Sequence, residues 1–524
     1  MTTACTILRQ NVDVIKDVAQ IMASSLGPAG KAKIFILPDG RKTITNNGKT
    51  ILRMLPLENP VARFAADFVS SLEDGIKSAF VFANSLLVRT LKLAEQGMHP
   101  MNAIPIYQVC AGKAADFLLE SGEKLWSIEN THLTKIVENV FHNKGIARHK
   151  RILAELLIKA CQSVAEENLE TDMGIHLDLS LITLFSQQQG HLDESNLIHG
   201  AVVRKGISYP LMPRRIENAG IVLLAADPES AIKTLLSRVR PVDATELQRL
   251  RKKSAYLTEK IVNTITGTGA NVVVSKNKIS HILLQKMSRQ GILVVDQVGE
   301  ADFERLCQAV GGRPVSILDS IATEDLGQAG LVREHGKAGN RFLVFTDCKN
   351  PSPVVLNIRA MTDYIFQNAA DAVLNAAWQI KDIMESGMIV YGAGSIEAIT
   401  ADYLRSWAQN LRSIERIAAI EFAEAIEEIP RQLATNAGFS PSRIIAMMHD
   451  RRRKEGYPWW GVDINRGDIF DAKLANIADP LNRTRRYIET ATQLVEMVIM
   501  FDEIHTIDTG FKKFSSAHMV TRPL

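Results

Sequence analysis

The hydrophobic pattern of this 524-residue chain changes character twice, and this change constrains the fold more than any other feature. Up to about residue 126, and again after about residue 362, apolar side chains recur at the three- and four-residue spacing of amphipathic helices. Between about 199 and 348, short β-branched runs alternate with helix-like segments, which favours an α/β domain. The order helical, α/β, helical indicates a nested layout in which both chain ends build one domain.

Several segments carry this pattern clearly enough to predict single elements. The spacing predicts helices over residues 6–25, 60–72, 78–96, 244–264 and 484–504. The first helix is expected to stop at Gly27 and Pro28, because proline lacks an amide proton and glycine tolerates positive φ. Two short runs, 33–37 and 43–45, flank a Pro-Asp-Gly turn and predict a hairpin. Strands are expected at 201–203, 220–224, 271–274, 291–295 and 314–317.

Composition narrows the class of protein. The 61 basic and 58 acidic residues leave a net charge of +3, which argues against a nucleic-acid binder that relies on a general basic field. The five cysteines lie far apart with no C-x-x-C, which excludes a disulfide framework and a cysteine-based zinc site. No apolar run of about 18 residues and no signal-peptide pattern is present. The chain is therefore expected to be a soluble intracellular protein with no membrane or nucleic-acid partner.

Short motifs occur along the chain in a fixed order. They are SLGPAG at 25–30, ITNNGKTIL at 44–52, GMHP at 97–100, MPRRIENA at 212–219, TGANVV at 268–273, EDLGQAG at 324–330, CKNP at 348–351 and FAEAIEEIPR at 422–431. In this order and spacing the segments resemble the group II chaperonins, the family of the archaeal thermosome and of the eukaryotic cytosolic chaperonin containing TCP-1. The resemblance extends from about residue 6 to residue 504.

The resemblance implies a multi-domain fold of α and α/β class. A helical equatorial domain, which binds nucleotide and makes ring contacts, would comprise residues 1–128 and 387–524. A small intermediate domain would comprise 129–198 and 349–386, and an α/β apical domain for client binding would comprise 199–348. The resemblance also implies a helical protrusion near 231–250, which in the family forms a lid over a chamber between two stacked rings.

The resemblance also implies a nucleotide site, although no Walker-type G-x-x-x-x-G-K-[ST] is present. The family's Gly-Asp-Gly-Thr-Thr-Thr corresponds to residues 73–78, where Glu73, Ile76 and Lys77 depart from it. Lys77 either supplies a cation to phosphate or is an ordinary exposed lysine, and the 26–28 loop either approaches nucleotide or simply ends a helix. The expected contacts are Leu26, Gly27, Pro28, Asp74, Gly75, Ile76, Lys77 and Ser78, with Asp74 as ligand of Mg²⁺.

Two further departures concern hydrolysis. The aspartate of the family's Thr-Asn-Asp-Gly corresponds to Asn47, and a second catalytic aspartate corresponds, by counting from the Arg-Ala-Met-Thr at 359–362, to Asn375. Asparagine has nearly the shape of aspartate but no charge and no basic oxygen. Loss of a positioned base typically costs about 10²–10⁴ in rate. We therefore expect ATP hydrolysis by this chain to be weakened or lost.

The other implied contacts are spread along the chain. Lys144 corresponds to the loop that senses the γ-phosphate, and Gly392 and Gly394 to the glycines near base and ribose. Asp463 and Asp479 correspond to carboxylates near the nucleoside, with a helix cap or surface turn as the alternative for each. The basic run at 451–454 is interpreted as a solvated helix end, with a partner contact or nuclear signal as the alternative.

These observations predict a subunit of a double-ring group II chaperonin that assists ATP-dependent protein folding in the cytoplasm. Its cofactors would be ATP or ADP and Mg²⁺, with weakened binding, and its partners sibling chaperonin subunits and unfolded client proteins. A homomeric ring without hydrolysis would not work, so the substitutions favour a hetero-oligomeric ring. One alternative is a chaperonin-derived scaffold for assembly of a specific complex, and another is an active ATPase in which Lys77 and other groups replace the aspartates.

Overall fold

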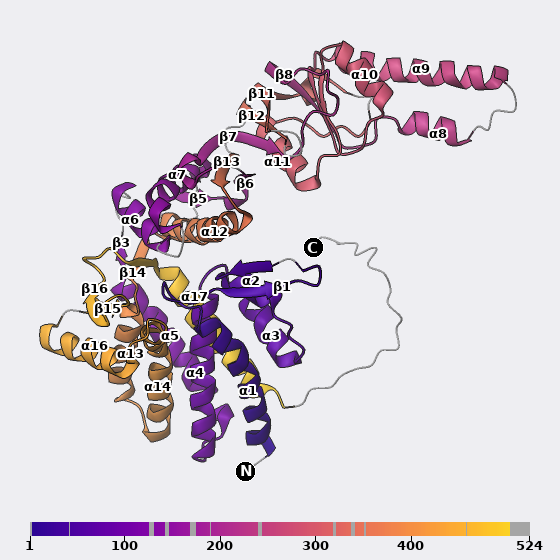
Figure 1. The fold of residues 1–524 in the computed structure, drawn as a ribbon. Coiled ribbons are helices and arrows are strands. Elements are labelled where there is room, and N and C mark those ends of the chain that lie inside the picture. Colours follow the sequence, from indigo (N-terminus) through magenta and orange to yellow (C-terminus); the bar gives the residue numbers. More distant parts are fainter. Residues whose placement is uncertain are drawn as a thin grey trace.

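Helices from both ends of the chain pack into one helical body (Figure 1). The structure is a computed structural model and describes residues 3–40, 42–124, 130–141, 146–167, 174–188, 190–238, 244–317, 321–336, 341–349, 353–456 and 458–502. Helix α1 (Thr3–Ala23) and helix α17 (Leu481–Met500) both lie against α4 (Ile76–Glu95). Their buried apolar side chains belong to a single core. The first and last parts of the chain therefore share one core.

The helical body contains further helices whose positions follow the predicted pattern. These are α2 (Gly48–Met54), α3 (Pro60–Val69), α5 (Ile104–Ser121), α13 (Ser395–Ala408), α14 (Ser413–Ile426), α15 (Glu428–Asn436) and α16 (Pro441–Glu455). In α1 the fully buried Ile15 and Met22 lie two turns apart on one face, as an amphipathic helix requires. The helices predicted at 6–25, 60–72, 78–96 and 484–504 are confirmed, with ends shifted by a few residues.

Small strands surround the helices of this body. The hairpin of β1 (Lys33–Ile36) and β2 (Lys42–Thr45) is the one predicted from the Pro-Asp-Gly turn, with Lys33 opposite Thr45. A three-stranded sheet in the order β17-β14-β3 joins distant segments, and β15 pairs with β16. The bounds are β3 (Glu123–Lys124), β14 (Met388–Tyr391), β15 (Trp460–Asp463), β16 (Asp468–Asp471) and β17 (Ala478–Pro480).

An eight-stranded sheet in the order β10-β9-β8-β11-β12-β7-β13-β6 lies in the middle of the chain. Its strands are β6 (Ile182–Gln188), β7 (Asn196–Val203), β8 (Arg215–Leu224), β9 (Val272–Ser275), β10 (Leu293–Val295), β11 (Gly327–His335), β12 (Phe342–Cys348) and β13 (Val354–Ala360). β8, β9 and β10 are parallel, whereas β11 and β12 pair antiparallel. The predicted strand at 314–317 is wrong, because only Val315 pairs, as an isolated bridge to Leu224, beside a proline that lacks an amide proton.

Four helices accompany this sheet. They are α8 (Ser230–Arg238), α9 (Ala244–Gly267), α10 (His281–Arg289) and α11 (Glu300–Val310). Helices α8 and α9 contact one another and extend away from the sheet, on the side remote from the helical body (Figure 1). The range 231–250 where the protrusion is expected covers α8 from its second residue and only the first part of α9, which continues to Gly267. Residues 239–243 of that range lie outside the described residues.

A third group of elements connects the helical body to the eight-stranded sheet (Figure 1). It consists of α6 (Asn130–Val140), α7 (Lys150–Val164), β4 (Ala165–Glu167), β5 (Ile175–Leu177) and α12 (Asp363–Ser386). Helix α12 begins at Thr362, whose side chain accepts a hydrogen bond from the amide of Ile365, and ends at Gly387 with φ 64°. It contacts β13 on one side and α17 on the other, so one of its faces is directed at the helical body.

A search of the described helices for one long and apolar enough to cross a membrane found none.

Candidate functional site

The start of α4 opens onto a cavity. Gly75 caps the helix with φ 86°, a left-handed conformation that glycine adopts without strain, and Asp74 Oδ1 accepts a hydrogen bond from the Gly75 amide at 2.7 Å. A Cβ atom at Gly75 would lie 3.3 Å from Cβ of Tyr487. The first amides of a helix have no intrahelical partner and carry the positive end of its dipole, so this helix start favours an anion.

Two adjoining cavities lie at this helix start. The first, of about 220 Å³, is lined by Leu26, Gly27, Pro28, Asn47, Gly48, Lys49, Glu73, Asp74, Gly75, Ile76, Lys77, Ser78, Asn139, Val140, Asn375, Gln379 and Arg483. The second, of about 390 Å³, is lined among others by Ala393, Gly394, Glu397, Asp463, Asp479, Arg483 and Tyr487. Leu26, Pro28, Ser78 and Arg483 are among the residues that line both. Together the cavities fall in the range of roughly 300–1,000 Å³ typical of ligand sites.

Most of the residues predicted from the sequence border these cavities, although their roles stay predictions. Leu26, Gly27, Pro28, Asn47, Asp74, Gly75, Ile76, Lys77, Ser78 and Asn375 line the first, and Gly394, Asp463 and Asp479 line the second. Gly392 stands behind Asp479, because a Cβ atom there would lie 2.5 Å from Asp479 Oδ2. Lys144 lies outside the described residues.

Asn47 and Asn375 both line the first cavity and contact one another directly. Asn47 Nδ2 donates to Asn375 Oδ1 at 3.2 Å, although the two residues are 328 positions apart. The other end of the Asn47 side chain caps α2, where its Oδ1 accepts from the Thr50 amide at 3.1 Å. Both polar atoms of Asn47 are thus engaged, and neither amide is basic.

Arg483 stands at the junction of the two cavities. Its Nε lies 2.9 Å from Asp74 Oδ2, and its Nη1 pairs with Oδ1 of Asp479, which lies four residues earlier in β17. The pKa of Arg483 is raised by the charges of Asp74 and Asp479, which outweigh the effect of its burial. A permanent positive charge therefore bridges the two carboxylates that the sequence assigned to the metal and to the nucleoside.

Lys77 points back toward the backbone rather than outward. Its Nζ donates to the carbonyl oxygens of Ser25, at 3.0 Å, and Asn46, at 2.9 Å. Those carbonyls follow α1 and precede α2, so the lysine ties the two chain segments that flank the first cavity. The alternative of an ordinary exposed lysine is wrong, because Lys77 is half-buried and lines the cavity.

One face of α12 closes over the first cavity through direct side-chain contacts. Asp371 Oδ2 accepts from Thr45 Oγ1 at 2.9 Å, and Gln379 Nε2 donates to Asp74 Oδ2 at 3.2 Å. Farther along, Arg486 Nη1 lies 3.3 Å from Asp382 Oδ1. Burial raises the pKa of Asp371 and of Asp382. Side chains spaced four residues apart share a helix face, which is why this single helix contacts the hairpin, α2 and α4.

The second cavity has a buried acid at its wall. Tyr487 Oη donates to Glu397 Oε1 at 2.8 Å, and burial raises the pKa of Glu397 and of Tyr487. Glu397 Oε2 is buried without a hydrogen-bond partner among the described residues. Asp463 instead caps a turn, since its Oδ1 accepts from the amides of Asn465 at 2.9 Å and Arg466 at 3.1 Å. The turn alternative for Asp463 is therefore confirmed, although Asp463 still lines the cavity.

The 26–28 loop is held by the C-terminal half of the chain. Gly27 has φ 72°, and a Cβ atom there would lie 2.3 Å from Leu433 Cδ2, so this turn requires glycine. Asn436 Nδ2 donates to the carbonyls of Ala23 and Leu26, at 2.7 and 2.9 Å. The loop follows the end of α1, as predicted for a turn that ends a helix. It also borders both cavities, which is the position expected of a loop that approaches nucleotide.

Sequence reasoning missed several residues of the cavity walls. Arg483, Gln379, Tyr487, Glu397 and Asn139 belong to this group. One local signal was available for Arg483, because it follows Asp479 by four residues directly before the helix predicted over 484–504, and such spacing favours an ion pair where it is helical. The contacts of Arg483 and Gln379 with Asp74 depend on tertiary packing and have no local signal.

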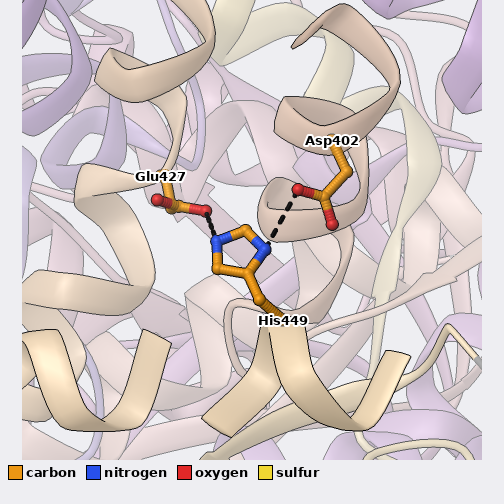
Figure 2. A group of neighbouring side chains, drawn as sticks. All are labelled: Asp402, Glu427 and His449. Carbon is orange, nitrogen blue, oxygen red and sulfur yellow. Dashed lines mark ion pairs between the residues drawn. The ribbon is translucent and has the colours of Figure 1, made fainter. Parts of the chain in front are cut away.

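A second charged cluster lies between helices α13, α15 and α16 of the helical body, and Figure 2 shows Asp402, Glu427 and His449 of this cluster. His449 of α16 stands between Asp402 of α13 and Glu427, with Nδ1 3.1 Å from Asp402 Oδ1 and Nε2 2.8 Å from Glu427 Oε1. Three arginines pair with the same carboxylates: Arg405 and Arg431 with Glu427, and Arg405 and Arg452 with Asp402. Although the three residues of Figure 2 have ligand atoms within 4.8 Å of one another, these arginines already neutralise the carboxylates that a metal would need.

The basic run at 451–454 is only partly the solvated helix end expected from the sequence. Its residues form the last turn of α16, where basic side chains favour the helix dipole. Arg452, however, is 9% exposed and pairs with Asp402 at 2.8 Å. The interpretation is therefore wrong for Arg452, because this side chain turns inward to the second charged cluster.

The fold and the cavity walls define a protein of mixed helical and α/β structure with a candidate anion site between segments from both chain ends. The sequence model of the TCP-1/cpn60 chaperonin family matches residues 18–507. A thermosome subunit of Methanopyrus kandleri is 31% identical over 500 residues, which cover 95% of this chain and 91% of the relative. A thermosome subunit beta of Archaeoglobus fulgidus is 31% identical over 501 residues, with the same coverage of both chains.

The chain therefore belongs to the TCP-1/cpn60 chaperonin family, and its thermosome relatives support its assignment to the group II chaperonins.

Proposed function

We propose that this chain is a subunit of a thermosome-like double-ring chaperonin that assists ATP-dependent protein folding, and that its own ATP hydrolysis is weakened or lost. The family match over residues 18–507 supports the chaperonin part of this proposal. The contact between Asn47 and Asn375 carries the second part, because it joins the two positions at which the resemblance expects catalytic aspartates.

Hydrolysis of ATP requires a group that orients the attacking water and accepts its proton. At Asn47 and Asn375 the side chains are neutral amides bonded to one another at 3.2 Å. An amide has no basic lone pair at neutral pH, so neither residue serves as the base. The loss of one positioned base costs about 10²–10⁴ in rate, and here both positions lack it.

The rest of the proposal concerns architecture and partners. We assign the equatorial domain to 1–128 and 387–524, the intermediate domain to 129–198 and 349–386, and the apical domain to 199–348. The shared core of α1, α4 and α17 supports the first assignment. A subunit without hydrolysis needs active neighbours, and the relatives include subunits named alpha and beta from one organism, Archaeoglobus fulgidus. We therefore propose a hetero-oligomeric ring with sibling subunits and unfolded clients, in the cytoplasm.

ATP turnover by the purified full chain tests the loss of hydrolysis. We expect a rate at least about 10²-fold below that of a thermosome subunit assayed in parallel. The matched variant carries Asn47→Asp and Asn375→Asp together, which restores carboxylates at both positions without changing side-chain size. A wild-type rate equal to that of the thermosome subunit would refute the proposed loss.

The native mass of the chain isolated from its own cells tests the ring assignment. A double-ring particle that contains sibling chaperonin subunits supports the proposal. A monomer, or a complex with unrelated proteins, would favour the scaffold alternative instead. The two experiments are independent, because a subunit without hydrolysis can still occupy a place in the ring.

A further inference from the structure

The residues around Asp74 do not fit a divalent metal. Magnesium is held by carboxylate oxygens together with waters and phosphates. Asp74 Oδ2, however, already lies 2.9 Å from Arg483 Nε and accepts from Gln379 Nε2 at 3.2 Å, while Asp74 Oδ1 accepts from the Gly75 amide. A cation at this carboxylate would therefore have to displace a guanidinium that carries the same sign of charge.

The charges that line the first cavity point to a different ligand chemistry. Lys49, Lys77 and Arg483 line it together with only two carboxylates, Glu73 and Asp74. Without any metal these side chains leave an excess of one positive charge, which Asp479 balances through its pair with Arg483, and the start of α4 adds the positive end of a helix dipole. An anion entering this cavity thus meets a field that is already favourable to it.

Arg483 has a donor available for such an anion. A guanidinium carries five N–H groups. The contacts with Asp74 and Asp479 use Nε and Nη1, so neither contact uses Nη2. Because Arg483 lines both cavities, its guanidinium stands at the point where a ligand spanning them would pass from one to the other.

We propose that Arg483 takes the place of the divalent metal in this pocket, so that the chain binds the phosphates of a nucleotide without Mg²⁺. This inference rests on the proposed function in one respect, namely that these cavities are the nucleotide site. Arg483 acts as a binding residue, and Asp74 is the carboxylate that holds it in place rather than a metal ligand.

The test is a calorimetric titration of the purified full chain with ADP, once in EDTA and once in excess Mg²⁺. We expect the two dissociation constants to agree within about threefold, because no step of binding at this site requires the metal. A thermosome subunit titrated in parallel shows how strongly Mg²⁺ affects ADP binding where a metal is used. Binding that requires Mg²⁺ would overturn the inference.

Two variants distinguish a metal ligand from a positioning carboxylate. Replacing Arg483→Gln should weaken ADP binding in EDTA by at least about tenfold, because a charge-assisted contact to phosphate is lost. Replacing Asp74→Asn should leave ADP binding in EDTA unchanged or tighten it, because Asp479 still holds the guanidinium, which is then less neutralised. If Asp74 were a metal ligand, Asp74→Asn would instead weaken binding in Mg²⁺, and that result would refute the inference.

Arg486→Gln is the matched control. Arg486 lies on the same helix three residues away, pairs with Asp382 at 3.3 Å, is half-exposed and does not line either cavity. It should bind ADP as the wild type does, and equal weakening by Arg483→Gln and Arg486→Gln would overturn the inference. Circular dichroism and thermal melting establish that each variant is folded before titration.

The outcomes separate this inference from the proposed function. If ADP fails to bind with or without Mg²⁺ while the chain is still found in a ring with sibling subunits, the inference fails and the ring assignment stands. If ADP binds equally in EDTA and in Mg²⁺ but the chain is found as a monomer, the ring assignment fails and the inference stands.

Discussion

Two clusters of charged side chains lie in the helical body, and they differ in what surrounds them. The pocket cluster, formed by Asp74, Asp479 and Arg483, borders two cavities, and its side chains are 21–28% exposed. The packed cluster, formed by Asp402, Arg405, Glu427, Arg431, His449 and Arg452, joins helices α13 to α16, and the side chain of Glu427 is only 1% exposed. Both contain carboxylates bridged by arginine.

The surroundings decide what each cluster does. In the packed cluster, the carboxylate of Glu427 is almost inaccessible to water, whereas its partners Arg405, Arg431 and His449 are 23–29% exposed. Removing a partner of such a buried carboxylate is strongly destabilising, because it leaves a buried charge uncompensated. In the pocket cluster, water or a ligand can reach a charge that loses its partner. We therefore expect the packed cluster to stabilise the fold and the pocket cluster to bind a ligand, and the predictions below test this contrast.

The largest effect is expected for Glu427→Ala in the packed cluster. Glu427 pairs with Arg405, Arg431 and His449, and all three would lose a buried partner. The free energy of unfolding should fall by about 3–5 kcal/mol, measured by chemical denaturation. Glu455→Ala is the control, because Glu455 pairs among the described residues with the exposed Arg451 on α16, and its loss should cost less than about 1 kcal/mol. Equal effects of the two substitutions would contradict the contrast.

The packed cluster should also make stability depend on pH. Hydrogen bonds to Asp402 and Glu427 raise the pKa of His449 from 6.5 to about 9. Because the folded pKa is the higher one, the stabilisation by His449 is fully present below pH 6.5 and is lost as the pH rises through 9. The difference in unfolding free energy between wild type and His449→Gln should thus be about 2–3 kcal/mol at pH 6 and approach zero above pH 9.

The pKa of Glu427 in the same cluster is shifted in the opposite direction to that of His449. The partners His449 and Arg405 outweigh burial and lower its pKa from 4.5 to about 2. Its stabilisation is therefore present above pH 4.5 and is lost as the pH falls through 2.

A difference between wild type and His449→Gln that does not change between pH 6 and pH 9 would refute the proposed role of His449.

A smaller effect is expected where Asn47 meets Asn375. Asn47→Asp and Asn375→Asp should each be nearly neutral, because one amide remains to donate a hydrogen bond to the new carboxylate across 3.2 Å. The two substitutions together place two negatively charged carboxylates in contact. A double-mutant cycle without Mg²⁺ should give a destabilising coupling of about 1–3 kcal/mol at pH 8, which disappears near pH 4. Additive effects at pH 8 would show that the side chains are not in contact.

The sequence predicted those parts of the pocket that short motifs encode. The 26–28 loop, Asn47 and residues 74–78 were implied by the resemblance of their motifs to the chaperonins, and all of them line the first cavity. Helices with strong apolar spacing were predicted because their pattern is local. The strand at 314–317 was not, because a β-branched run also needs neighbouring strands to pair with.

Other features have no local signal. Arg483 meets Asp74 across 409 positions of sequence, and Gln379 meets it across 305, so both contacts arise only when the chain ends and α12 have packed together. The packed cluster was missed for the same reason, since its residues belong to α13, α15, α16 and the turn between α14 and α15, and the sequence predicted Arg452 to be solvated. Charged residues in a helix give the same sequence pattern whether they face water or another helix.

The smallest effect on stability is expected for Arg483→Gln in the pocket cluster. Asp74 and Asp479 would lose their cation, but both border the cavities, where water can solvate them. The cost should therefore be no more than about 1 kcal/mol, as for partly exposed ion pairs, while ADP binding in EDTA falls at least about tenfold. Chemical denaturation of Arg483→Gln and Glu427→Ala side by side checks this ranking.

Arg405→Gln in the packed cluster is the control for that ranking, because it also removes one guanidinium, here from the three carboxylates of Asp402, Glu424 and Glu427. We expect it to cost several times more stability than Arg483→Gln and to leave ADP binding unchanged, since it lines neither cavity. If Arg483→Gln were as destabilising as Arg405→Gln, the guanidinium of Arg483 would stabilise the fold, as that of Arg405 does in the packed cluster. The cavity around it would then have no bearing on what the cluster does.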